Sequence, residues 1–301
     1  MTRSLLLKLA AVALVLALIS VWMGQQAYRW LPPPASAEAL LVDGLFSLMT
    51  ALGSFIFLGV TGTLLYAMVF QRAGKYDERD GPPIEGNTTL EVVWTVIPIL
   101  LVIWLAAASY RVYDQMAVLG PMEHVHLGMD SAQAAPLMDA PTAAAPETIQ
   151  VRARQWTWEF YYPQQQVAST ELHLPNNRRI NLTLTSEDVI HGIYIPAFRL
   201  KQDIIPGRAI DFAFTPIREG TYRLRDSQYS GTYFAAMQTN VVVESASAYQ
   251  QWLDQAARQP RQPAPNPAYQ EYQASLEKGA RPGWKTIVPA PPPLVNGVGG
   301  S

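Results

Sequence analysis

The feature that most constrains this chain is the run of residues 45–70, which contains no charged side chain. About 26 residues at ~1.5 Å each are enough to cross a ~30 Å hydrocarbon core as a tilted helix. A second apolar run, residues 92–110, contains Pro98, which is expected to kink the helix. The two runs predict a transmembrane hairpin over residues 38–116.

An earlier apolar run, residues 5–23, follows Arg3 and contains Lys8. A basic start, an apolar centre and the small-residue pattern Ala35-Ser36-Ala37 are typical of a signal peptide. The run is also long enough to remain as a third membrane span. The sequence therefore leaves two alternatives for residues 1–37, a cleaved signal peptide or a signal anchor.

Basic residues indicate how the hairpin is oriented. Short loops rich in Lys and Arg stay on the cytoplasmic side. The loop at residues 71–89 and the N-terminus together supply Arg3, Lys8, Arg72, Lys75 and Arg79. Everything after residue 111 is then expected on the opposite, external face.

Composition narrows the possible functions. Only 15% of residues are charged, 49% are hydrophobic and the formal net charge is −2, so no basic surface for nucleic acid is expected. The chain has no cysteine, which excludes disulfides, zinc–thiolate sites, thiol nucleophiles and copper–thiolate sites.

The external part begins with an Ala-, Met- and Pro-rich linker at residues 117–147. Its residues 122–129 (MEHVHLGM) could hold copper through imidazole and thioether groups, or could be ordinary polar residues of a linker. Residues 148–245 alternate between apolar and polar in short runs, beginning with residues 148–160, and predict a β-sandwich. Residues 246–301 are expected to form a helix at 248–257 and a Pro-rich tail that lies over a surface.

Three segments resemble the second subunit of haem–copper terminal oxidases. They are residues 90–98 (LEVVWTVIP), residues 155–160 (QWTWEF), and the stretch from residues 188–191 (DVIH) through 200–203 (LKQD) and 206–208 (PGR) to 220–222 (GTY). The resemblance implies a membrane helical hairpin joined to an all-β, cupredoxin-like Greek-key sandwich. It also implies a non-catalytic subunit of a complex that reduces oxygen to water.

The family's external domain normally carries a dinuclear copper centre with the pattern Cys-x-Glu-x-Cys-x3-His-x2-Met and an earlier histidine. In the matching positions this chain has Asp226, Gln228, Ser230, Phe234 and Met237, with His191 as the earlier histidine. Only His191 and Met237 are retained. A mixed-valence copper pair needs bridging thiolates, which carboxylate, hydroxyl and phenyl groups cannot replace. We therefore expect no metal at these positions, with His191 and Met237 as core residues.

Without that copper, the resemblance points to a quinol oxidase or an alternative respiratory terminal oxidase. The loop at residues 226–231 (DSQYSG) is similar to that of bo-type quinol oxidases, whereas residues 200–203 are closer to the copper-containing branch. Quinol is the expected donor. A soluble cytochrome c-type or copper-protein donor is one alternative, and a scaffold or assembly protein without a redox role is another.

The resemblance also implies partners and a location. We expect no cofactor on this chain; the haems and a haem-linked copper belong to subunit I, and a third subunit is a further partner. The chain would lie in a bacterial energy-transducing membrane, cytoplasmic or thylakoid, in contact with lipid. Its β domain would face the periplasm or lumen.

Several single residues are candidates for roles in that complex. Glu91 matches an acid at the proton-channel entrance, although Thr88 and Glu91 also fit a helix-capping box. Gln228 matches a ligand of a metal at the boundary with subunit I, or forms an ordinary interface hydrogen bond. Trp156 matches the aromatic position through which electrons enter, and is expected to be structural here. Asp203 and Arg208 match the docking face for subunit I, or form a solvated turn pair.

Overall fold

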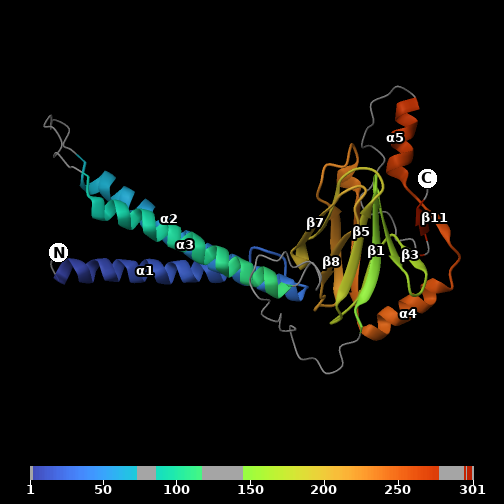
Figure 1. Cartoon of the computed structure of the whole chain (residues 1–301), viewed down its shortest axis with the longest axis horizontal. Helices are drawn as coiled ribbons and strands as arrows, with labels where there is room; N and C mark the ends of the chain where they lie inside the picture. The colour runs from blue at the N-terminus through green and yellow to red at the C-terminus, as the bar shows by residue number, and fades with distance from the viewer. Residues whose placement is uncertain (1–2, 73–85, 117–144, 278–294, 296, 300–301) are drawn as a thin grey trace. The chain divides into compact units, whose positions relative to one another are not determined.

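The computed structural model describes residues 3–72, 86–116, 145–277, 295 and 297–299. The chain forms two compact units, one of residues 1–31 and 42–114 and the other of residues 32–41 and 115–301. The first unit is helical. The second unit is built on β-strands (Figure 1).

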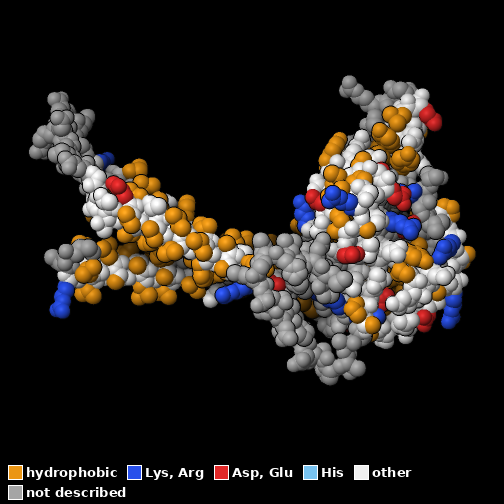
Figure 2. Space-filling view, viewed as in Figure 1, with side chains coloured by type: hydrophobic (Ala, Val, Ile, Leu, Met, Phe, Trp, Pro, Cys, Tyr) orange, Lys and Arg blue, Asp and Glu red, His pale blue; other side chains and the backbone are white. Residues whose placement is uncertain are grey.

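The helical unit contains α1 (Arg3–Ala27), α2 (Ala37–Phe70) and α3 (Thr88–Met116). Each of the three is long and apolar enough to cross a membrane. Their side chains are mostly exposed, and Figure 2 shows hydrophobic groups along their surface. Such a surface is stable in lipid rather than in water. The predicted membrane spans are confirmed, and the run at residues 5–23 belongs to a continuous helix.

Close packing joins α1 to α2 at Gly24. The Ser47 hydroxyl donates a hydrogen bond to the Gly24 carbonyl at 2.8 Å. A Cβ atom at Gly24 would lie 2.8 Å from the Ser47 carbonyl oxygen and 3.0 Å from the Ala51 side chain. A small residue at this position therefore lets the two backbones approach, as is common between membrane helices.

The external unit is a sandwich of two five-stranded sheets. The first has the order β3-β2-β1-β5-β8 and the second the order β4-β10-β9-β6-β7. The strands of the first sheet are β1 (Glu147–Arg154), β2 (Thr157–Tyr162), β3 (Val167–Ser169), β5 (Ile180–Ser186) and β8 (Ile210–Phe214). Those of the second are β4 (Leu172–Pro175), β6 (His191–Ile195), β7 (Leu200–Ile204), β9 (Gly220–Asp226) and β10 (Gln238–Glu244).

Each sheet contains one parallel pair among antiparallel neighbours. β1 runs parallel to β5 with Glu147 opposite Ile180, and β10 runs parallel to β4 with Val241 opposite Leu172. Alternate residues of β1 and β10 are buried, which follows from the two-residue period of a strand. The inward side chains of both sheets form one apolar core. The predicted sandwich is confirmed.

The expectation of one alternating strand over residues 148–160 is wrong. β1 ends at Arg154, the chain turns at Gln155 and Trp156, and β2 returns antiparallel with Thr157 opposite Arg154. The Gln155 amide donates to the Asp188 carboxylate at 2.7 Å instead of continuing the ladder. Alternation alone did not reveal this turn, because Trp156 and Trp158 both point into the core.

Residues 246–277 form more regular structure than the sequence suggested. α4 (Ala246–Ala257) agrees with the predicted helix, and the Ser245 hydroxyl caps it by accepting the Ala248 amide at 3.3 Å. The chain continues through β11 (Gln262–Ala264) to a further helix, α5 (Pro267–Glu277), which the Pro-rich composition did not predict. β12 (Gly297–Gly299) pairs with β11.

The small-residue pattern Ala35-Ser36-Ala37 is part of the folded external unit. Ala35 and Ser36 have no exposed surface. The Ala35 amide donates to the Ala197 carbonyl at 2.9 Å, its carbonyl accepts the Ile217 amide at 3.0 Å, and Ser36 forms a β-bridge with Pro216. This segment is therefore joined to the external unit by backbone hydrogen bonds and one isolated β-bridge. Whether residues 1–37 are cleaved stays open.

Candidate functional site

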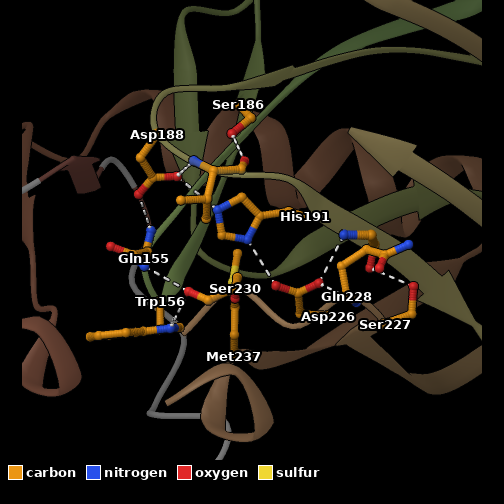
Figure 3. A network of polar contacts seen from close by, with 12 residues as sticks. Gln155, Trp156, Ser186, Asp188, His191, Asp226, Ser227, Gln228, Ser230 and Met237 are labelled. Carbon is orange, nitrogen blue, oxygen red and sulfur yellow. Dashed lines mark hydrogen bonds and ion pairs between the residues drawn. The ribbon is translucent and has the colours of Figure 1, made fainter. Parts of the chain in front are cut away.

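The positions that match the family's copper ligands meet at one end of the second sheet. His191 begins β6 and has no exposed surface. Its Nδ1 lies 2.8 Å from Oδ2 of Asp226, at the end of β9, and its Nε2 lies 2.9 Å from Oδ1 of Asp188 (Figure 3). We call Asp188, His191 and Asp226 the Asp–His–Asp cluster.

Backbone amides hold both carboxylates of the Asp–His–Asp cluster. Asp226, whose side chain is fully buried, also accepts the amides of Gly192 at 2.8 Å and Gln228 at 3.0 Å. Asp188 accepts the amides of Gln155 and Val189, each at 2.7 Å. Hydrogen bonds of this kind favour an ionised carboxylate.

The charge on His191 follows from these contacts. Burial disfavours the charged ring, but the hydrogen bonds and attraction from Asp188 and Asp226 outweigh it and raise the pKa of His191 above 6.5. Burial also acts to raise the pKa of Asp188, but the hydrogen bonds from His191, Gln155 and Val189 outweigh it and lower that pKa below 3.8. The contacts with Asp188 and Asp226 thus favour the protonated form of the buried His191 ring.

This arrangement does not fit a dinuclear copper centre. Both ring nitrogens of His191 are bound to carboxylates, so neither offers a lone pair to a metal. Ser230 contributes a neutral hydroxyl, and Phe234 packs its ring 5.2 Å from that of Tyr229. Across the described residues, no three His, Asp or Glu side chains are arranged to hold a metal ion. Hard oxygen ligands cannot bridge a mixed-valence copper pair.

The loop after β9 is fastened to the turn between β1 and β2. The Ser230 carbonyl accepts the Gln155 side-chain amide at 2.7 Å and the Trp156 indole N–H at 3.0 Å. Gly231 has φ +111°, and a Cβ there would lie 2.8 Å from Gln155 Nε2 and 3.0 Å from the Trp156 ring. Only glycine fits this close approach without strain. Trp156 is 5% exposed.

Comparison with known proteins identifies the family. A family model described as the transmembrane domain of cytochrome c oxidase subunit II matches residues 20–112, and the model of the periplasmic domain matches residues 164–246. Cytochrome c oxidase subunit 2 of Synechocystis sp. is 34% identical over 266 residues, covering 80% of each chain. The chain belongs to the subunit II family of haem–copper oxidases.

Other relatives of this subunit II are named as subunits of cytochrome c oxidases or of quinol oxidases. Cytochrome c oxidase subunit 2 of Thermostichus vulcanus is 33% identical and covers 80% of this chain and 82% of its own. Quinol oxidase subunit 2 of Bacillus subtilis is 28% identical, and the match covers 64% of this chain and 54% of that protein. The crystal structure of the periplasmic domain of subunit II (CoxB) of Bradyrhizobium japonicum is 27% identical, with a TM-score of 0.35, covering 38% of this chain and 94% of that one.

Family membership establishes the general setting of this subunit II. It is an integral membrane component of an oxidoreductase complex that also contains a subunit I, and its sandwich is the periplasmic domain. The predicted fold class, a membrane helical part with a cupredoxin-like domain and a C-terminal helix, is confirmed.

The predicted docking residue Asp203 is paired with Gln228 in this subunit II. Gln228 donates from its side-chain amide to the Asp203 carboxylate at 2.8 Å, which ties the loop after β9 to β7. Arg208 is exposed in the turn after Pro206, where Gly207 has φ +75° as a type II turn requires. Gln228 and Asp203 therefore form one hydrogen-bonded pair, and Arg208 is not part of it.

Glu91 is exposed in the first turn of α3. The predicted capping box, with Thr88 as its cap, is wrong. Asn87 is the N-cap: its side-chain oxygen accepts the Leu90 amide at 3.2 Å. Asparagine is the stronger capping residue, so it takes this position, and Glu91 is then the fourth rather than the third residue after the cap.

The sequence interpretation missed Asp188 as the second partner of His191. Its place three residues before the histidine was a usable signal, but only the fold brings it within hydrogen-bond distance. The predicted copper-binding alternative at residues 122–129 lies outside the described residues. Met237 is buried beside the cluster, with its carbonyl accepting the Asp226 amide at 3.0 Å.

Proposed function

We propose that the oxidase containing this subunit II takes its electrons from a membrane quinol and reduces oxygen to water, and that the subunit itself carries no redox metal. The observation that supports this proposal is the state of His191, the retained histidine of the family's copper site. Both of its nitrogens are bound to carboxylates. Its ring is held by hydrogen bonds to Asp188 and Asp226 rather than left open to a metal.

The chemistry of this position argues for a lipid-soluble donor. A soluble donor that docks on the external domain needs a redox centre within that domain to receive the electron. The Asp–His–Asp cluster, the Ser230 hydroxyl and the Met237 side chain supply none. Quinol instead diffuses in the lipid and can donate directly to the haems that are expected in subunit I, together with a haem-linked copper.

A soluble donor is the second candidate, and the names of the relatives favour it. The Synechocystis and Thermostichus proteins, at 34% and 33% identity, are named cytochrome c oxidase subunit 2, whereas the quinol oxidase subunit of Bacillus subtilis is 28% identical. Overall identity reflects the core and the membrane helices more than the few ligand positions. The ligand positions therefore have more weight in the choice of donor.

The purified complex tests the proposal directly. We expect rapid, cyanide-sensitive oxygen consumption with quinol, slow consumption with reduced soluble cytochrome c, and only the haem-linked copper in metal analysis. Fast oxidation of cytochrome c with inert quinol would overturn the choice of donor. A near-infrared band of a dinuclear copper pair would overturn the absence of metal. A complex that consumes no oxygen with either donor would favour the scaffold or assembly role.

The remaining roles concern assembly and proton uptake. We propose that Glu91 lies at the entrance of the proton channel of subunit I, since its carboxylate is exposed at a helix start on the cytoplasmic side. We also propose that Asp203, Gln228 and Arg208 face subunit I, where Gln228 forms a hydrogen bond rather than holding a metal. A third subunit completes the proposed complex.

A further inference from the structure

The small-residue pattern Ala35-Ser36-Ala37, at the start of α2, is typical of a signal-peptide cleavage site. Cleavage there would cut the bond between Ala37 and Glu38. In the structure this bond lies in the first turn of α2, which begins at Ala37, and Glu38 is only 5% exposed. Proteolysis occurs preferentially in exposed, flexible segments, so the folded chain is a poor substrate at this bond.

Ser36 has a structural role that cleavage would remove. Its hydroxyl accepts the Ala39 amide at 3.1 Å, which makes Ser36 the N-cap of α2, and donates to the Phe198 carbonyl at 3.0 Å. A serine cap satisfies one of the amides that the start of a helix leaves unpaired. A chain that began at Glu38 would lack this cap. It would also place a positively charged amino group at the end of the helix where the dipole favours negative charge.

Hydrogen bonds attach the chain to the external unit on both sides of the same bond. Before it, the Arg199 guanidinium donates to the Pro32 carbonyl at 2.7 Å, and the Ala37 amide donates to the Thr215 carbonyl at 2.9 Å. After it, the Glu38 carboxylate accepts the Thr215 amide at 3.1 Å. The sandwich therefore uses the residues before the cleavage position as part of its own fold.

Within the helical unit, α1 has a fitted contact with α2. Besides the hydrogen bond and the close approach at Gly24, Ser20 is only 3% exposed, and the Trp30 ring lies 6.3 Å from the Phe46 ring in an edge-to-face arrangement. Small residues and a hydrogen bond at the contact are typical of lasting pairs of membrane helices. A signal peptide, in contrast, needs only an apolar centre.

We propose that the pattern at residues 35–37 is not a processing site, and that the assembled subunit keeps α1 as a third membrane helix bound to α2. Cleavage would discard the cap of α2, the hydrogen bonds to the sandwich and the helix contact together. In the uncleaved chain, Arg3 and Lys8 hold the start of α1 on the cytoplasmic side, in agreement with the positive-inside rule. This inference does not depend on which donor feeds the complex.

Because the chain has no cysteine, thiol labelling tests the proposal directly. Ser4→Cys places a thiol in α1, and the matched Ser247→Cys places one in α4. The complex is purified from membranes, denatured and treated with a maleimide dye, and the dye is measured in the gel band of this subunit. We expect equal labelling of the two variants. Label in Ser247→Cys without label in Ser4→Cys would overturn the proposal, as would a chain beginning at Glu38 in mass spectrometry.

A second measurement tests whether the retained α1 is bound to α2. Gly24→Leu disrupts the contact, and Ala13→Leu is the matched control because Ala13 is an exposed small residue of the same helix. In the complex in mild detergent, amide hydrogen exchange of residues 20–27 should rise about tenfold or more in Gly24→Leu alone, since packing limits local opening. Failure of Gly24→Leu alone to assemble would have the same meaning. Equal exchange in the two variants would overturn the helix contact.

Discussion

Replacing Asp226 by alanine tests the central physical claim, that an ion cluster stabilises the site. The substitution removes the carboxylate that binds His191 Nδ1 and leaves the amides of Gly192 and Gln228 without their acceptor. Breaking a buried ion pair by removing one partner costs about 3–5 kcal/mol. At roughly 4 °C per kcal/mol for a domain of this size, the Tm of the external domain should fall by about 10–20 °C.

The measurement is thermal unfolding of the purified complex, followed by hydrogen exchange in β6 and β9. Asp211→Ala is the matched control, since Asp211 is an exposed carboxylate that accepts one hydrogen bond from Thr183 at 3.0 Å. Its loss should cost about 0.5 kcal/mol. Asp226→Asn should fall between the two, because an amide N–H can donate to a neutral imidazole. Equal stability of Asp226→Ala and Asp211→Ala would refute the reasoning.

Three further predictions concern pH, proton uptake and helix packing. Because folding raises the pKa of His191, the stability that this histidine contributes should be complete below about pH 6.5 and should be lost as the pH rises through its folded pKa. Because folding lowers the pKa of Asp188, the stability that this carboxylate contributes should be present above pH 3.8 and should be lost as the pH falls through its folded pKa. The Tm should therefore be highest between these two pH limits. If His191→Gln lost stability at alkaline pH in the same way as the unaltered protein, the prediction would be contradicted. Glu91→Gln should slow oxygen reduction about tenfold or more without dissociating the complex, whereas Asn87→Ala removes only the helix cap; equal turnover in both would leave Glu91 without a proton role. Gly24→Leu should separate α1 from α2, since even a Cβ there would lie 2.8 Å from the Ser47 carbonyl, and an unchanged yield of folded subunit in detergent would show that this contact is dispensable.

Much of the architecture could be predicted from local sequence. Apolar runs long enough to cross a membrane define α1, α2 and α3, and alternation predicts the sandwich because burial in it has a two-residue period, although β3, β4, β6 and β7 were not among the expected strands. Predictions from local sequence were wrong where a neighbouring residue could take the same role or where a turn interrupted the pattern. Asn87 rather than Thr88 caps α3, and the turn at Gln155 interrupts an alternating run whose inward residues continue on both sides.

Other features depended on contacts between distant segments. Asp188 and Asp226 are 38 positions apart, yet both bind the ring of His191. Ala35 and Ser36 have the pattern of a cleavage site, yet both are buried and Ser36 forms an isolated β-bridge with Pro216. Helix α5 follows a Pro-rich stretch and has few apolar residues, so its own sequence did not predict it. It is stabilised by Trp156 and Tyr233, which are distant in the sequence.

The sequence by itself determined the membrane helices and the absence of any thiolate ligand, because chain length, hydrophobicity and residue chemistry are local properties. Tertiary structure decided how the retained histidine is bound. It brings two carboxylates to opposite nitrogens of one buried imidazole and places the C-terminal helix over the adjacent tryptophan. Those contacts depend on which strands become neighbours, since hydrogen bonds and ion pairs act only over a few ångströms.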